Sequence, residues 1–308
     1  MISIVIPAHD EEQVIGRCLG TLLAGAAAGE FDVVVVANGC RDHTAEVARS
    51  FAGVRVVETP AASKAAALNS AEAAGLGYPR VYLDADVEVD APAIRAVAAA
   101  LENDGVELAA PGIRFDVRGR SWGVRAWCRI WSRLPYATED HVGSGLYALS
   151  RAGRQRFGPF PDTMAEDLFV WSCVPRSARK AVPDHEFTVH PPLRLAGLVR
   201  VLGRMHAASR ADRALFADAT SEVTEGQVRA LARLLRSVRD VPAVLAYAGV
   251  AAAARLVARR PDVRSGRSWL RDNSARDAHR RAVSDPLAAG QRGLGPDPEP
   301  NRQRVGRP

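Results

Sequence analysis

The chain has 308 residues, of which 47% are hydrophobic and 25% charged, as is typical of a folded globular protein. Its formal net charge of +6 favours anionic partners. Zinc-finger spacing, a basic helix with heptads and aromatic-rich basic strands are all absent, so we expect no nucleic acid partner. An anionic membrane surface and a phosphorylated substrate fit the charge equally well.

Cysteine spacing and the start of the chain bear on its cellular location. The four cysteines are far apart, without a Cys-x-x-Cys pair or a histidine at ligand spacing. We interpret them as free thiols: Cys18, Cys40, Cys128 and Cys173. A strand-like segment directly after Met1 leaves no room for a signal peptide. We expect a cytoplasmic protein, with association at the inner face of the membrane as an open alternative.

Apolar strand-like segments alternate with helices in the first half of the chain. The expected strands are Ile2–Ile6, Phe31–Ala37, Val54–Val57 and Val81–Leu83. Helical periodicity follows the first and second strands, and an alanine-rich helix from Lys64 to about Ala74 follows the third. Unbroken Val/Ile runs between helices predict an α/β fold with a mostly parallel central sheet flanked by helices.

Each expected strand runs into a polar loop at its carboxyl end. These loops are residues 7–12, 38–44, 59–64 and 84–86. Because ligands of parallel sheets bind beyond the carboxyl ends of the strands, we expect the loops to converge on one crevice. The chain has neither a P-loop nor a Gly-x-Gly-x-x-Gly loop after the first strand, which argues against P-loop enzymes and dinucleotide oxidoreductases.

Asp84 and Asp86 follow the fourth strand, one residue apart. Paired carboxylates suit Mg²⁺ or Mn²⁺, while the alternative is an ordinary acidic turn. The other loops also have structural alternatives: Glu11 as a helix-start acid, Asn38 in a turn and Lys64 as a solvated charge. Their expected position beside the paired aspartates favours ligand contact. For Asp42 and Thr44, helix capping is the favoured interpretation.

Four motifs in this order resemble the family 2 glycosyltransferases, which have the GT-A fold. They are Ile4–Glu12, Val35–Thr44, Ser63–Asn69 and Asp84–Asp86, and the resemblance covers roughly residues 1–190. It implies a nucleotide-diphosphate sugar donor, most often a UDP-sugar, and a divalent metal, Mg²⁺ or Mn²⁺.

The resemblance also implies roles for individual residues. Pro7, Ala8 and Glu11 would line the nucleoside, Asn38 would lie near the base, Lys64 would approach the base or diphosphate, Asp84 would meet the ribose or metal, and Asp86 would ligate the metal. The chain departs from the family pattern at Asp10, Ala37 and Ser63. Because Ala37 replaces a frequent base-contacting aspartate, UDP and GDP both stay open as the nucleotide.

The second half adds acceptor-side and catalytic candidates. Trp127 and Trp131 share a helix face, which favours core packing over an acceptor platform. Residues 142–151 resemble the family's acceptor-side strand. Asp167 matches the family's general base, with Glu166 as a supporting or orienting residue. His190 is a candidate metal ligand, with a surface or capping role as the alternative.

Helices are expected beyond residue 190. They comprise a helix with Leu193–Leu202, a second from Glu222 to Val238, and the uncharged stretch Val241–Ala254. The last is too short to span a membrane, which leaves a packed helix or an interfacial helix flanked by arginines. The predicted division is a GT-A catalytic domain at 1–192, a C-terminal helical extension at 193–260 and a disordered tail at 261–308.

The sequence therefore predicts a metal-dependent, inverting glycosyltransferase. The Gln-x-x-Arg-Trp signature of processive synthases is absent, which favours transfer of a single sugar. The acceptor is an unidentified hydroxyl compound, either a small molecule or a lipid-linked one on a membrane surface. The alternatives are a non-catalytic sugar-nucleotide-binding module and a sugar nucleotidyltransferase, although the acidic first loop lacks the glycines and cation that bind a triphosphate.

Overall fold

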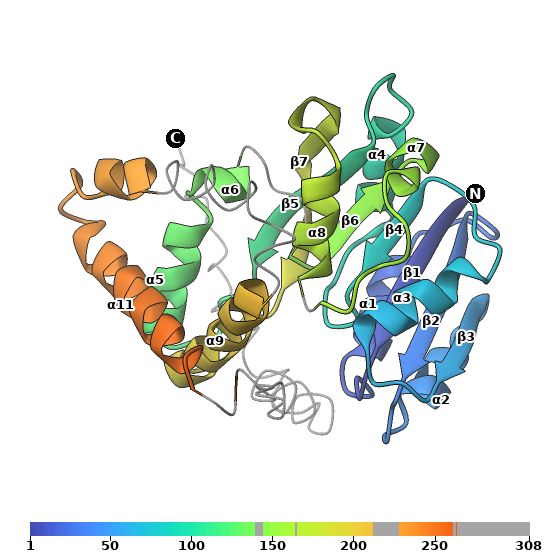
Figure 1. Cartoon of the computed structure of the whole chain (residues 1–308), viewed down its shortest axis with the longest axis horizontal. Helices are drawn as coiled ribbons and strands as arrows, with labels where there is room; N and C mark the ends of the chain where they lie inside the picture. Colours follow the sequence, from blue (N-terminus) through green and yellow to red (C-terminus); the bar gives the residue numbers. More distant parts are fainter. Residues whose placement is uncertain (139–143, 164, 212–227, 261–262, 264–308) are drawn as a thin grey trace, which may run out of the picture.

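A seven-stranded sheet forms the centre of the computed structural model, in the order β3-β2-β1-β4-β6-β5-β7 (Figure 1). The structure describes residues 1–138, 144–163, 165–211, 228–260 and 263. The strands are β1 Ile2–Ala8, β2 Phe31–Asn38, β3 Val54–Thr59, β4 Arg80–Leu83, β5 Leu108–Phe115, β6 Leu146–Leu149 and β7 Arg179–Val189. The helices are α1 Ile15–Leu23, α2 Thr44–Arg49, α3 Lys64–Glu72, α4 Ala91–Ala100, α5 Trp122–Trp131, α6 Pro135–Thr138, α7 Arg151–Gln155, α8 Glu166–Cys173, α9 Leu195–Ala211 and α11 Val241–Val257.

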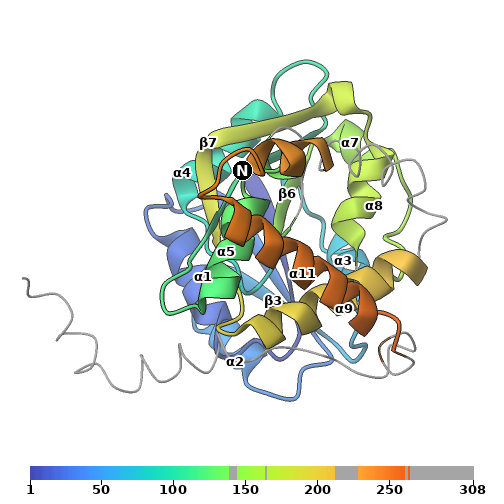
Figure 2. The ribbon, with the colours of Figure 1, turned by 90° about the vertical axis from the view of Figure 1, so that its left-hand side faces the viewer.

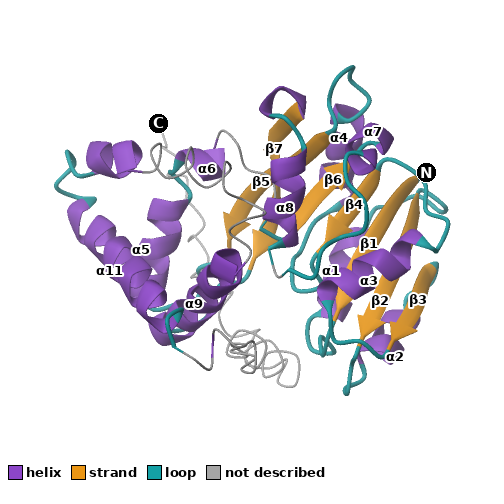
Figure 3. Ribbon diagram, in the orientation of Figure 1, coloured by secondary structure: helices purple, strands orange, loops and turns teal. Residues whose placement is uncertain are grey.

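The sheet is parallel except for one strand. β1 pairs in parallel with β2 and β4, and β2 with β3. β6 runs antiparallel between β4 and β5, while β5 and β7 are parallel to each other. Helices flank both faces of this sheet (Figure 3). The predicted α/β class with a mostly parallel sheet is therefore confirmed.

Burial on both faces explains the unbroken apolar strands. On one face Ile4 and Ile6 of β1 pack in a core with residues of α1 and α4. On the other, Val5 packs in a second core with residues of α3 and α8. Because successive side chains of a strand point to opposite faces, a strand covered on both sides must be apolar at every position.

The parallel pairing brings the predicted polar loops to one edge. Ala8 at the end of β1 pairs with Ala37 of β2, and Val5 of β1 pairs with Tyr82 near the end of β4. The carboxyl ends of these three adjacent strands therefore lie together, and the segments that follow them begin at the same edge. This is the crevice that the sequence predicts.

α5, α9 and α11 form a helical layer at one side of the molecule (Figures 1 and 2). Trp127 of α5 stacks on Trp131 and on Tyr247 of α11, with ring centroids 6.1 Å apart in each pair. Asp240, just before α11, accepts hydrogen bonds from Arg129 at 2.6 Å and Arg133 at 3.0 Å. Trp127 thus packs against a helix more than a hundred residues further along the chain, and Trp131 packs in the same core cluster, as expected for core aromatics.

The C-terminal predictions are only partly covered by the described residues. The uncharged stretch forms α11, and the helix expected around residues 193–202 is α9. Of the helix expected at 222–238, residues 222–227 lie outside the described part, as does nearly all of the tail at 261–308. No helix within the described ranges is both long enough and apolar enough to cross a bilayer. The domain division stays a prediction.

Asp240 should anchor the helical layer. Its side chain is 10% exposed and accepts hydrogen bonds from two arginines, so Asp240→Ala removes two charged hydrogen bonds. We expect the free energy of unfolding in urea to fall by about 1–2 kcal/mol, less than for a fully buried pair because the arginines are partly in water. The matched control is Glu186→Ala, which removes the exposed ion pair with Arg114. Equal losses in the two variants would contradict the anchoring role.

Candidate active site

The Lys64 ammonium joins two carboxylates at the centre of the crevice. Its Nζ lies 2.5 Å from Asp84 Oδ1 and 2.5 Å from Glu166 Oε1. Lys64 is the first residue of α3, Asp84 follows β4, and Glu166 is the first residue of α8. Three elements from distant parts of the chain therefore meet in one ion-pair cluster. The solvated-charge alternative for Lys64 does not hold in this structure.

A small pocket surrounds this cluster. Its lining comprises Pro7, Lys64, Leu68, Tyr82, Leu83, Asp84, Gly145, Tyr147, Glu166 and Asp167. Pro7, Lys64, Asp84, Glu166 and Asp167 were predicted as site residues from sequence, and the fold brings all five to this one pocket. The pocket combines apolar walls with several carboxylates and one ammonium, which is the composition of a polar ligand site.

Burial and charge together set the protonation of the cluster. Burial raises the pKa of Glu166 to about 7, and the charges of Asp167 and Asp84 add to the rise against the pull of Lys64. Burial also raises the pKa of Asp84, despite the nearby ammonium. For Lys64, burial would lower the pKa, but the two carboxylates outweigh it and raise the pKa. Two carboxylates thus share one ammonium, and the negative charge of Asp167 acts on both of them.

Asp167 is oriented by the backbone. Its Oδ2 accepts a hydrogen bond from the Ser144 N–H at 2.9 Å, and its Oδ1 accepts one from the Leu168 N–H at 2.8 Å. Gly145 makes this approach feasible: its φ is +121°, and a Cβ there would lie 2.7 Å from the Val87 side chain. The Gly145 carbonyl in turn accepts from the Asp84 N–H at 2.8 Å. Of the small residues predicted before this strand, Gly145 is therefore required sterically, while Val142 and Gly143 lie outside the described residues.

The loops after β1 and β2 are tied to each other. The Glu11 N–H donates to Thr44 Oγ1 at 2.7 Å, and the His9 ring donates from Nδ1 to the Asn38 carbonyl at 2.6 Å. The remaining residues predicted to line the nucleoside are all buried here: Ala8 and Asn38 end β1 and β2, and Glu11 lies in the loop after β1. Asp42 accepts a hydrogen bond from the Thr44 N–H at 3.1 Å, as expected for a residue at a helix start.

Asp86 and His190 lie at the edge of this arrangement. Asp86 is exposed, and its negative charge contributes to the raised pKa of Asp84. His190 follows β7, where Nε2 pairs with Glu88 and Nδ1 lies 3.5 Å from Asp116. Its hydrogen bond is the main cause of the lowered pKa of Glu88. The structure thus gives His190 two carboxylate partners, and its role as a metal ligand stays a prediction.

Sequence reasoning missed two residues of the pocket region. Tyr147 of β6 is 3% exposed, and its hydroxyl has no hydrogen-bond partner among the described residues. Burial raises the pKa of Tyr147, and the charge of Glu166 adds to the rise. Ser144 serves through its backbone N–H. The alternation of the strand 146–149 could have identified Tyr147 as inward-facing, but no sequence signal marks a backbone donor.

The raised pKa of Glu166 makes stability depend on pH. Its ordinary value is 4.5 and its value in the fold about 7. A group whose pKa is raised by folding stabilises the folded state fully when the pH is below its unfolded-state pKa. This stabilisation is lost as the pH rises through its folded-state pKa. From pH 4.5 to pH 8, the unfolding free energy of ligand-free Glu166→Gln should therefore rise relative to wild type by roughly 1–3 kcal/mol.

The measurement is urea denaturation at several pH values. Glu107→Gln is the matched control, because the hydrogen bond from Arg156 lowers the pKa of Glu107. A carboxylate whose pKa is lowered by folding stabilises the folded state when the pH is above its ordinary pKa, and this stabilisation is lost as the pH falls. The control Glu107→Gln should therefore change in the opposite sense, because it loses stability relative to wild type as the pH rises. Parallel pH profiles for wild type and Glu166→Gln would contradict the account.

Comparison with known proteins places this geometry in a family. Residues 3–154, from β1 through β6, match the family described as Glycosyl transferase family 2. No curated protein matches the chain.

Solved structures of glucosyl-3-phosphoglycerate synthase from Mycobacterium tuberculosis are similar to the chain at low identity. The complex with Mn²⁺, UDP and glucosyl-3-phosphoglycerate is 22% identical, covering 61% of this chain and 70% of that one, with a TM-score of 0.45. The complex with Mn²⁺, UDP-glucose and glycerol 3-phosphate is 21% identical over the same shares, with a TM-score of 0.44. Similarity at this level supports no functional argument.

The family match agrees with the motifs and with the strand order, and it confirms the predicted GT-A fold. It covers the loops that carry Pro7, Asn38, Lys64, Asp84 and Asp86. Through residues 3–154 the chain belongs to glycosyl transferase family 2, and the protein is a glycosyltransferase.

Proposed function

We propose that the protein transfers a single sugar from a nucleotide-diphosphate sugar to a hydroxyl acceptor, with a divalent metal and with inversion at the anomeric carbon. The observation that carries the proposal is the pocket in which Lys64, Asp84, Glu166 and Asp167 meet. It provides a cation for phosphate and a carboxylate for proton transfer within one crevice. A UDP-sugar is the favoured donor, with GDP as the open alternative because of Ala37.

The charges in the pocket fit a divalent cation. Asp84 and Glu166 share one ammonium, Asp167 lines the same pocket, and Asp86 adds a further carboxylate two residues beyond Asp84. Carboxylate oxygens are the donors that Mg²⁺ and Mn²⁺ prefer. Asp84 and Asp86 would hold the ion, with His190 as a further candidate. When bound, such an ion stabilises the negative charge of the departing diphosphate.

The other residues divide the remaining work. Pro7, Ala8, Glu11 and Asn38 would line the nucleoside, since they lie at the carboxyl ends of β1 and β2 and in the loop after β1, where the two segments are tied together. Lys64 would approach the diphosphate, where its ammonium adds positive charge. Glu166 would keep Lys64 in place, because it is 3% exposed and already paired with that ammonium.

Asp167 is the proposed general base. Two backbone N–H groups fix its carboxylate at the pocket wall, and no side chain of the described residues is bonded to it. Inverting transfer needs a carboxylate that takes the acceptor proton as the hydroxyl attacks the anomeric carbon from the face opposite the diphosphate. A non-catalytic binding module would have no use for this carboxylate.

The surface of α11 supports peripheral membrane contact and, with it, a lipid-linked acceptor. Leu245 and Leu256 are 64% and 63% exposed, whereas Val244 and Val250 are buried. Positions 245 and 256 fall on the same side of a helix, because eleven residues complete about three turns. Arg255 lies beside this face, and an apolar face with flanking arginines suits an anionic surface. A small-molecule acceptor is the open alternative.

Asp167→Asn should abolish most turnover while keeping donor binding. The assay measures the rate of nucleoside diphosphate release from a panel of UDP- and GDP-sugars, with lipid-linked and small hydroxyl acceptors. We expect this rate to fall about 10²- to 10⁴-fold. Calorimetric affinity for the nucleotide should stay within about twofold of wild type. The matched control is Asp162→Asn. Asp162 is an exposed residue just before the same helix, and its carboxylate accepts a hydrogen bond from the Ser63 hydroxyl. Unchanged turnover in Asp167→Asn would refute the base assignment and favour the binding module.

A further inference from the structure

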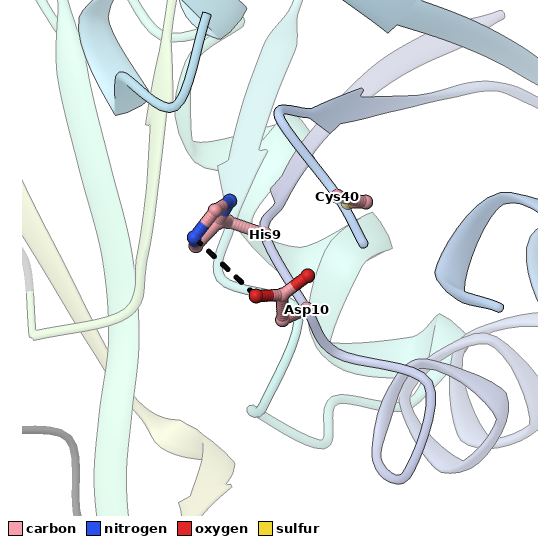
Figure 4. A group of neighbouring side chains, drawn as sticks. All are labelled: His9, Asp10 and Cys40. Atoms are coloured by element: carbon pink, nitrogen blue, oxygen red, sulfur yellow. Dashed lines mark ion pairs between the residues drawn. The ribbon is translucent and has the colours of Figure 1, made fainter. Parts of the chain in front are cut away.

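His9, Asp10 and Cys40 come together at the loops that follow β1 and β2 (Figure 4). Their ligand atoms, an imidazole nitrogen, a carboxylate oxygen and a thiol sulfur, all lie within 4.8 Å of one another. None of the three is fully exposed, and His9 is 17% exposed in its side chain. The group therefore combines three different types of metal ligand, all partly buried. This distinguishes it from an ordinary cluster of acidic residues on the surface.

The histidine is oriented in the way that metal-bound histidines usually are. His9 Nδ1 lies 2.6 Å from the Asn38 carbonyl oxygen. Because a carbonyl can only accept, Nδ1 carries the proton, and in the neutral ring Nε2 carries the lone pair. Nε2 is the atom that lies on the side of Asp10, 3.6 Å from Oδ2. Donation of the second ring nitrogen to a backbone carbonyl is the common outer-shell arrangement around zinc.

The backbone conformation of Asp10 and a hydrogen bond from the loop after β2 fix the position of its carboxylate. Its φ of +50° lies in the left-handed region, which aspartate tolerates better than most side chains. Oδ1 accepts a hydrogen bond from the Arg41 N–H at 2.7 Å, while Oδ2 is the oxygen toward His9. The two carboxylate oxygens are therefore divided between the loop backbone and the cluster.

Cys40 completes the group from the second loop. Its Sγ lies 3.3 Å from the Ala8 carbonyl oxygen, so the thiol donates to the end of β1. A metal would replace the thiol proton and this weak bond. Tetrahedral zinc bonds of about 2.0–2.3 Å place neighbouring ligand atoms about 3.3–3.6 Å apart. The separation of His9 Nε2 from Asp10 Oδ2 already matches this range, and one ring nitrogen of His9 and one carboxylate oxygen of Asp10 lie within 4.8 Å of the Cys40 sulfur.

We propose that His9, Asp10 and Cys40 form a zinc site between the two loops, with a fourth position open to water. Its chemistry differs from that of the proposed site at Asp84 and Asp86, because thiolate and imidazole select zinc, whereas oxygen ligands alone select Mg²⁺ or Mn²⁺. Zinc here would cross-link the loops that directly follow Ala8 and Asn38. The inference rests on this geometry and does not depend on the proposed transfer reaction.

Co²⁺ is the probe, because a thiolate–Co²⁺ bond gives a charge-transfer absorption that oxygen ligands do not give. The full chain is stripped of metal with a chelator, kept reduced, and titrated in excess Mg²⁺ so that oxygen-only sites are occupied. We expect one equivalent of Co²⁺ to produce the thiolate band with tetrahedral visible bands, and Zn²⁺ to displace it. Zn²⁺ should also raise the midpoint of thermal unfolding.

Substitutions then assign the ligands. Cys40→Ser should remove the thiolate band, and Cys40→Ser and His9→Gln should each weaken Zn²⁺ binding by about tenfold or more. Cys173→Ser is the matched control, since Cys173 is also a partly buried free thiol, on α8. It should bind like wild type, as should Asp86→Ala, which separates this site from the proposed Mg²⁺ or Mn²⁺ site.

Two results would overturn the proposal. One is the absence of a thiolate–Co²⁺ band in the wild type, and the other is a band that persists unchanged in Cys40→Ser. Circular dichroism checks that each variant is folded. If Cys40→Ser does not fold, His9→Gln decides alone, because unchanged Zn²⁺ affinity in that variant also refutes the site.

Discussion

The site depends on one partly buried ammonium that is held between two acidic side chains. Lys64 lies 2.5 Å from Asp84 and 2.5 Å from Glu166, and each partner comes from a different element. Glu166 is 4% exposed, and its ionised form needs the ammonium beside it, since burial of an unpaired charge is costly. The cluster therefore fixes the positions of α3 and α8 relative to β4, and it leaves an excess of acidic groups that suits a cation.

The fold supplies the frame on which this cluster is built. Parallel pairing of β2, β1 and β4 places their carboxyl ends side by side, and the antiparallel β6 returns Gly145 and Tyr147 to the same edge. Gly145 accepts from the Asp84 N–H, while its neighbour Ser144 donates to Asp167. The Asp84 side and the Asp167 side of the pocket are thus joined through two adjacent residues, Ser144 and Gly145.

Local sequence patterns predicted the strand ends well, because continuous apolar runs followed by polar residues leave few alternatives. Pro7, Asn38, Lys64 and Asp84 were identified in this way and through their order along the chain. Contacts between distant segments could not be predicted. The pairing of Lys64 with Glu166 and the packing of Trp127 on Tyr247 depend on how helices dock, which no local pattern encodes. His9 and Cys40 also lack ligand spacing, since their proximity arises only when β1 and β2 pair.

The most direct test of the donor site is calorimetric titration of UDP and of GDP, each with and without Mn²⁺, into wild type and Asp86→Ala. The account predicts that one nucleotide binds in a metal-dependent manner and that the substitution weakens this binding by about tenfold or more. Asp104→Ala, which changes an exposed aspartate after α4, should bind like wild type. Binding of neither nucleotide, or binding that is indifferent to both Mn²⁺ and Asp86, would contradict the account.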